Sequence, residues 1–182
     1  MAPEYLPEQG RRGITILPPL NNDHLARDIE VDQEVVLFVY GPGGGTTSPR
    51  DLHWSLAWQV SNGGWKHIHV TAENTPYDRH LPWRYVYWGP QTKTAGLATY
   101  QARKTSLGVM NSATRKRIEA IAWEVGVAKP DGQWNCQHWI LALLGKLYEN
   151  RVINQAQWSK AIADASHLWD DWFARRARAG RA

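Results

Sequence analysis

Hydrophobic and polar positions follow two patterns along this chain, and each pattern predicts its own kind of element. Continuous or alternating apolar runs bounded by Gly, Pro or Asn are typical of β-strands. They occur over residues 13–17, 34–40, 53–60, 65–71, 84–88 and 96–100. Apolar positions three or four residues apart predict helices. They occur from a cap at Asn111 to about Val125, from 136 to about 148, and from 155 to 178. The pattern predicts an α+β fold with a small antiparallel sheet.

The runs 53–60 and 65–71 flank a Ser-Asn-Gly-Gly segment at 61–64, which predicts a β-hairpin. A three-residue loop with Gly63 in the left-handed conformation pairs Val60 with residue 64. Because side chains alternate between the faces of a sheet, His53, His67 and His69 then share one face. A two-residue loop would instead place His53 on the face opposite the other two histidines. We favour the longer loop because it gathers three polar imidazoles on one face.

The one cysteine of the chain, Cys136, opens the apolar helix predicted from residue 136. Asn135 is a good N-cap, which places Cys136 in the first helical turn. Unpaired backbone N–H groups and the positive end of the helix dipole favour thiolate over thiol there, and the same N–H groups could bind an oxyanion. We therefore expect a lowered pKa and a nucleophilic role for this thiol, if a base lies beside it. The alternative is a small buried residue without chemistry.

Three short motifs together resemble those of the lecithin:retinol acyltransferase and H-Ras-like suppressor family: His53-Trp54, Ile68-His69-Val70 and Asn135-Cys136-Gln137-His138-Trp139. The resemblance covers about residues 35–155 and implies a circularly permuted papain-like fold of the NlpC/P60 type, with the sheet packed on the Cys-bearing helix. It also implies that Cys136 is the nucleophile, that His53 is the general base and that His69 orients His53.

This chain departs from the family pattern in three ways. Gln137 stands where the family usually has Glu, Trp139 stands for Phe, and the hairpin is about four residues longer between its histidines. The longer hairpin leaves His67 as the alternative to His69. The related PPPDE peptidases share the His-before-Cys order and the Asn-Cys-x-His motif.

The resemblance implies acyl transfer, or amide or ester hydrolysis, through a thioester intermediate on a small or lipid-like substrate. Two alternatives stay open, namely a PPPDE-type cysteine peptidase or isopeptidase and a non-catalytic module that binds an aromatic ligand. Most of the eleven tryptophans are expected in the core. Trp54 and Trp134 lie nearest in sequence to the proposed chemistry, so we expect them to line a substrate cleft. The glycine-rich loop over 41–49 is expected to form a flap at its rim.

Composition limits the remaining classes. A chain of 182 residues with 43% hydrophobic residues predicts a single domain over 1–182, with residues 1–12 and 176–182 loose. One cysteine excludes an intramolecular disulfide and fits a reducing compartment. The first residues lack the features of a signal peptide, and no run approaches the roughly 20 apolar residues of a membrane span. We therefore expect a cytoplasmic protein without a transmembrane segment.

Charge and motif content predict neither a nucleic-acid partner nor a cofactor. The net charge of +4 comes largely from arginines near the two ends, without a pattern of a nucleic-acid-binding domain. His53, His67, His69 and His138 could gather, but the chain has no His-Glu-x-x-His or Cys-x-x-Cys spacing. We expect no metal and no cofactor. The oligomeric state is not predicted by the sequence.

Overall fold

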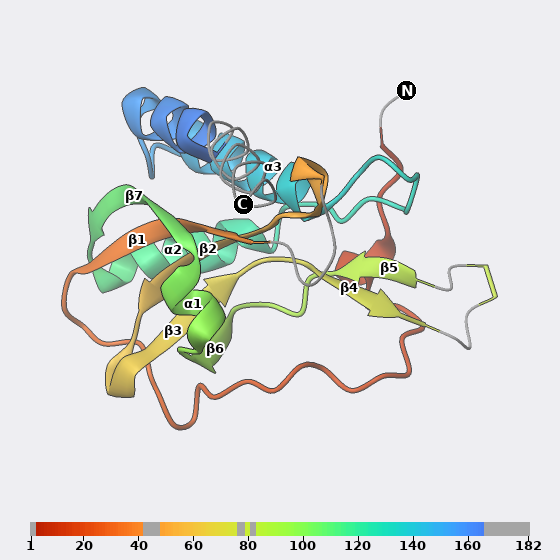
Figure 1. Cartoon of the computed structure of the whole chain (residues 1–182), viewed down its shortest axis with the longest axis horizontal. Coiled ribbons are helices and arrows are strands. Elements are labelled where there is room, and N and C mark those ends of the chain that lie inside the picture. The colour runs from red at the N-terminus through yellow and green to blue at the C-terminus, as the bar shows by residue number, and fades with distance from the viewer. Residues whose placement is uncertain (1–2, 42–47, 76–78, 81–82, 166–182) are drawn as a thin grey trace, which may run out of the picture.

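The computed structural model describes residues 3–41, 48–75, 79–80 and 83–165, and all elements, contacts and partners of the protein are given for these residues. The fold is α+β, as the sequence predicts, and Figure 1 shows its helices packed on an antiparallel sheet. The larger sheet, ordered β6-β3-β2-β1-β7, consists of β1 (Gln33–Tyr40), β2 (His53–Gln59), β3 (Gly64–Ile68), β6 (Gln91–Thr94) and β7 (Arg103–Met110). A smaller sheet pairs β4 (Thr71–Asn74) with β5 (Trp83–Val86).

The helices and short 3₁₀ turns connect and cover these strands. They are η1 (Pro7–Gly10), η2 (Pro49–Asp51), η3 (Ser61–Gly63), α1 (Leu97–Gln101), α2 (Ser112–Ala122) and α3 (Cys136–Glu149), followed by a helical stretch over 155–165. The predicted cap of α2 is present, since the side chain of Asn111 accepts a hydrogen bond from the Thr114 N–H at 2.8 Å. Every described helix is too short or too polar to span a bilayer.

The β2–β3 hairpin has the predicted three-residue loop. The Val60 N–H donates to the Gly64 carbonyl at 2.9 Å, and Gly63 has a φ of 69°. Leu56 then lies opposite Ile68, which is the register that the loop fixes. The hairpin histidines consequently share one face of the sheet.

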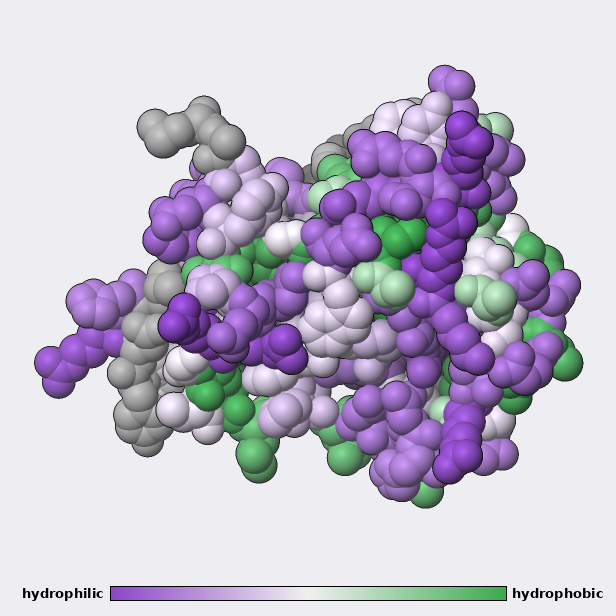
Figure 2. All heavy atoms as spheres, turned by 180° about the vertical axis from the view of Figure 1, so that it is seen from behind, coloured by the Kyte–Doolittle hydropathy of each residue, from purple (hydrophilic) through white to green (hydrophobic). Residues whose placement is uncertain are grey.

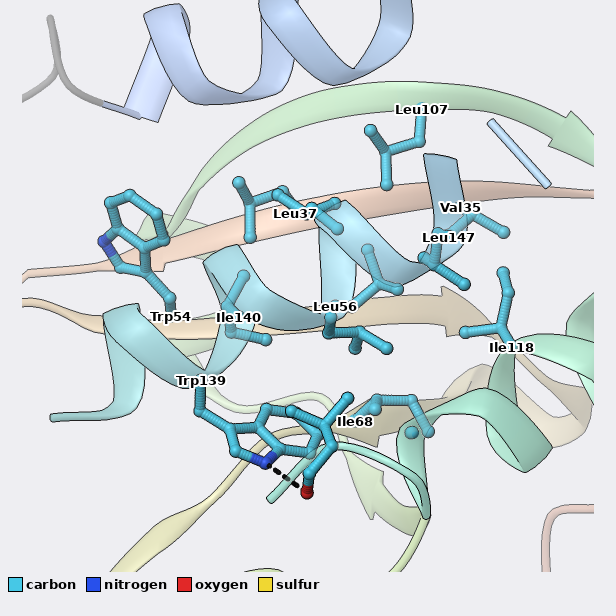
Figure 3. Close-up of a cluster of buried hydrophobic side chains, with 14 of the residues drawn as sticks. Val35, Leu37, Trp54, Leu56, Ile68, Leu107, Ile118, Trp139, Ile140 and Leu147 are labelled. Atoms are coloured by element: carbon cyan, nitrogen blue, oxygen red, sulfur yellow. Dashed lines mark hydrogen bonds between the residues drawn. The ribbon is translucent and has the colours of Figure 1, made fainter. Parts of the chain in front are cut away.

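The two faces of the larger sheet have different neighbours. One face carries the main core, in which Leu37 and Leu56 pack with Trp139 and Ile140 of α3 (Figure 3). Trp139 also donates from Nε1 to the Val125 carbonyl at 3.3 Å. The opposite face holds a smaller apolar cluster consisting of Val36, Phe38, Ala57 and Ala102 with Tyr40 and Trp65 packed against it. The hairpin histidines lie on this second face, and their rings contact Phe38 and Tyr40. Seen from behind, the molecule is mostly hydrophilic, and its apolar residues are scattered in small groups (Figure 2).

Two predicted strands are wrong. Residues 13–17 form no strand, and Leu17 is 88% exposed, because Pro18 and Pro19 end the apolar run before it can pair. Residues 96–100 belong to α1 instead, where Thr99 is buried between the exposed Leu97 and Tyr100. Strands β4, β6 and β7 are not predicted, because they consist largely of polar residues and lack the alternation of apolar and polar positions that indicates a strand.

The predicted helix over 155–178 is helical over 155–165, and its remainder lies outside the described residues. The same holds for residues 42–47 of the predicted flap and for 176–182. The N-terminal segment, expected to be loose, is instead hydrogen-bonded where it is described. Leu6 N–H donates to the Val127 carbonyl at 2.7 Å, and Tyr87 N–H donates to the Gln9 carbonyl at 3.0 Å.

Candidate active site

The first turn of α3 is fixed to the segment that precedes β2. The Asn135 side chain caps the helix by accepting from the Gln137 N–H at 3.1 Å, and its own amide donates to the Arg50 carbonyl at 3.1 Å. Gln137 Nε2 donates to the Leu52 carbonyl at 2.9 Å. The Cys136 thiol donates to the same carbonyl, with 3.8 Å between sulfur and oxygen. The Gln137 side chain therefore helps to position Cys136 through its contact with Leu52.

Cys136 and His53 border one pocket of about 460 Å³ at the start of β2. Its aromatic wall consists of Trp83, Tyr85 and Trp134. The Trp83 and Tyr85 rings are 6.0 Å apart and the Tyr85 and Trp134 rings 5.5 Å apart, both pairs edge to face. The pocket is therefore an aromatic-sided cleft with a thiol and an imidazole at its border.

The hairpin places His69, and not His67, in contact with His53. His53 Nε2 and His69 Nδ1 are 2.6 Å apart. His67 Nδ1 lies 3.1 Å from Ser55 Oγ instead. In the contact with His69, His53 uses Nε2, so Nδ1 is the ring nitrogen left for any other partner.

The thiol and the His53 imidazole do not contact each other directly. Both residues are described, and no hydrogen bond joins Cys136 to His53, whose ring lies on the second face of the sheet with Tyr40. Trp54, the residue next to His53, points to the opposite face and packs in the main core with Cys136. The Cys136 and His53 side chains therefore lie on different faces of the sheet, and both border the pocket where β2 begins.

The expected lowering of the Cys136 pKa is wrong in direction. Burial raises the pKa of the Cys136 thiol, and hydrogen bonding from the backbone N–H groups of Trp54, Cys136 and Gln137 offsets only part of that rise. The helix N-terminus is present as predicted, but the apolar packing around the sulfur outweighs it. The uncharged thiol is therefore the resting form at neutral pH.

The imidazoles are also uncharged at rest. Burial, and secondly the charge of Lys93, lowers the pKa of His53 to about 4. The same two causes lower the pKa of His67 to about 3, and burial holds the pKa of His69 well below its usual value. A neutral imidazole can accept a proton, so burial keeps His53 available as a base above about pH 4.

We expect iodoacetamide labelling of the native protein to have a pH midpoint above about 8.5, the ordinary value for cysteine. The reason is that burial disfavours the thiolate, so labelling should grow only as the pH rises through the raised pKa of Cys136. In urea, the midpoint should return to the ordinary value, and Cys136→Ser should not be labelled because the chain has no other cysteine. A native midpoint below that of the unfolded chain would contradict this prediction.

The two predicted cleft tryptophans have different positions. Trp134 is part of the aromatic wall, whereas Trp54 is 2% exposed and packs in the main core. Trp83 and Tyr85 are wall residues that the sequence pattern does not reveal. The two residues are two positions apart, so both lie on one face of β5. No feature of the sequence around β5 indicates that this strand lies beside Cys136.

A second pocket of about 230 Å³ lies beyond His53, on the face away from α3. It is bordered by the three hairpin histidines, Tyr40, Lys93 and Thr99. Lys93 Nζ is 3.2 Å from His69 Nε2. Among the described residues, no group of three or more His, Cys, Asp or Glu side chains is arranged to hold a metal ion. His53 borders both pockets and is the side chain that connects them.

Comparisons of this chain with protein-family models, with curated proteins and with solved structures found no match. A function for this protein therefore rests on the motifs and the geometry of its own chain.

Proposed function

We propose that this protein is a cysteine-nucleophile acyltransferase or hydrolase on a permuted papain-like scaffold. Cys136 is the nucleophile, His53 the base, and His69 the residue that orients His53. The observation that carries the proposal is the shared pocket of Cys136 and His53, combined with the 2.6 Å contact of His69 to the Nε2 of His53. That contact fixes one side of the imidazole and leaves Nδ1 for the thiol proton.

The neutral resting state supports a concerted first step. As the sulfur of Cys136 bonds to the substrate carbonyl carbon, the thiol proton passes to His53, and the carbonyl oxygen becomes an oxyanion. The backbone N–H of Cys136 at the start of α3 is suited to stabilise that oxyanion, whereas the Gln137 and His138 N–H groups donate to the Asn135 cap. The imidazolium then protonates the leaving group, which leaves a thioester on Cys136. Water or another acceptor, deprotonated by His53, releases the acyl group and restores the thiol.

The pocket favours a small substrate with an apolar or aromatic part. About 460 Å³ is within the usual size of small-ligand sites, and three aromatic rings form one side. Such a wall suits an acyl chain, a flat ring or an aromatic side chain. Because the chain has one cysteine and its proposed chemistry needs a free thiol, we propose a reducing compartment such as the cytoplasm.

One observation favours a second candidate, a non-catalytic module that binds an aromatic ligand. The thiol is buried and donates to the Leu52 carbonyl rather than to an imidazole. If that contact persists when a ligand is bound, the pocket serves binding alone.

The proposal is tested by the mass of the intact protein after incubation with a p-nitrophenyl ester of a short-chain acid. We expect one acyl group per chain, bound to Cys136 and absent from Cys136→Ala. His24→Ala is a matched histidine control, because His24 is exposed and borders neither pocket. This variant should acylate like the wild type.

The same experiment separates the alternatives. Labelling by an electrophilic ubiquitin-like probe, without labelling by the ester, would favour the isopeptidase. Quenching of tryptophan fluorescence by indole or a similar aromatic ligand, without any adduct from either reagent, would favour the binding module and overturn the enzymatic proposal.

A further inference from the structure

Three nitrogen-bearing side chains form a line from the first pocket through the second. His53 Nε2 is 2.6 Å from His69 Nδ1, and His69 Nε2 is 3.2 Å from Lys93 Nζ. Each imidazole of the line is neutral, so each carries one ring proton and one lone pair. The position of one proton therefore determines the position of the next.

A charged Lys93 selects one arrangement. An ammonium group only donates, so His69 must accept with Nε2 and carry its proton on Nδ1. His69 Nδ1 then donates to His53 Nε2, and the proton of neutral His53 has to be on Nδ1. In this arrangement, the ring nitrogen needed for the thiol proton is already protonated.

An uncharged Lys93 allows the opposite arrangement. Its amine can accept from the protonated Nε2 of His69, whose Nδ1 then accepts from His53 Nε2 and leaves a lone pair on His53 Nδ1.

We infer that Lys93 is a positioning residue that selects, through His69, which ring nitrogen of His53 carries the proton. The inference rests on the proposed function in one respect, namely that His53 is the base. The ammonium form holds the site inactive and the amine form makes it competent. The charged and titratable groups that face Lys93 are His53 on β2, His67 and His69 on and after β3, Tyr40 on β1 and Glu73 on β4.

Substitutions that fix the charge state at position 93 should change the pH dependence of turnover in opposite ways. Lys93→Arg keeps a permanent donor, so above the pKa of wild-type Lys93 its kcat/KM should be at least about tenfold below that of the wild type, since a wrong histidine tautomer costs up to about 10⁴-fold in a serine-protease triad. Lys93→Met removes the donor, so kcat/KM at pH 7 should rise several-fold. Burial lowers the Lys93 pKa, so activity of the wild type should increase as the pH rises through that lowered value, and Lys93→Met should lose this part of the profile.

Lys104→Met is the matched control. It removes a lysine charge from the same sheet, but Lys104 Nζ lies over the Phe38 and Trp65 rings instead of an imidazole. Its kcat/KM should equal that of the wild type. Thermal unfolding of every variant shows that a change in activity is not a loss of folded protein, and Lys93→Leu provides a second side chain without a donor if Lys93→Met unfolds.

A readout without turnover separates this inference from the proposed function. In Cys136→Ala labelled with ¹⁵N-histidine, long-range ¹H–¹⁵N spectra report the tautomer of His53. We expect the Nδ1–H form at neutral pH and in Lys93→Arg, and the Nε2–H form at high pH and in Lys93→Met. If the His53 tautomer is the same in all variants, the inference is overturned. If the tautomer shifts as expected but the wild type forms no acyl-enzyme, the proposed function fails and the role of Lys93 stands.

Discussion

Replacing His53 by alanine is expected to lower kcat/KM for a test ester by about 10²–10⁴-fold, the usual contribution of a general acid–base residue. No other described imidazole borders the Cys136 pocket, so no second histidine can take over as base. In the wild type, His53 Nε2 lies 2.6 Å from His69 Nδ1. His69→Gln should retain partial activity, because a polar amide can still form a hydrogen bond with His53 Nε2. His67→Ala should change turnover little.

His67→Ala is the informative control in this series, since His67 lies on the same face but bonds to Ser55 at 3.1 Å. Initial rates at several pH values, with thermal unfolding of each variant, decide between the histidines. If His67→Ala were as damaging as His53→Ala while His69→Gln had no effect, the orienting residue would be His67, and the roles assigned to the hairpin histidines would need to be exchanged.

Asp28→Ala is expected to lower the free energy of unfolding by about 3–5 kcal/mol, the usual result of leaving one partner of a buried ion pair unpaired. The Asp28 carboxylate accepts from the Arg115 guanidinium at 2.7 and 3.2 Å and from Trp58 Nε1 at 3.1 Å. Arg115 is fully buried, and it also donates to the carbonyls of Val31 and Met110. Without Asp28, its charge stays in the core with neutral acceptors only.

Glu30→Ala is the matched control for Asp28→Ala. Glu30 lies two residues away and pairs with Lys116 at 3.2 Å, but both side chains are exposed, so the loss should be much smaller than that for Asp28→Ala. Urea unfolding followed by tryptophan fluorescence measures both changes. A loss for Asp28→Ala no larger than that for Glu30→Ala would show that the buried pair contributes nothing beyond a surface pair.

The parts of the site that can be predicted from the sequence are those set by local rules. Asn135 caps α3 and the parity of the hairpin loop places His53 and His69 on one face, because both depend on residues close together in the chain. Trp83 and Tyr85 of the aromatic wall and Lys93 are not predicted, since β5 and β6 reach the site only through tertiary packing. The predicted lowering of the Cys136 pKa is wrong for the same reason. The helix N-terminus can be read from the sequence, but the burial that outweighs it cannot.

The contacts that hold Cys136 have a consequence for the order of folding. His53 and His69 are 16 residues apart and meet within one hairpin, whereas Cys136 and Gln137 contact Leu52 across 84 and 85 residues. Closing the longer loop costs more chain entropy, so we expect the imidazole pair to assemble early and the helix with its thiol to dock late. A chain emerging from the ribosome would carry an uncovered cysteine until that step, and its exposure to oxidants would depend on how fast α3 docks rather than on the stability of the finished fold.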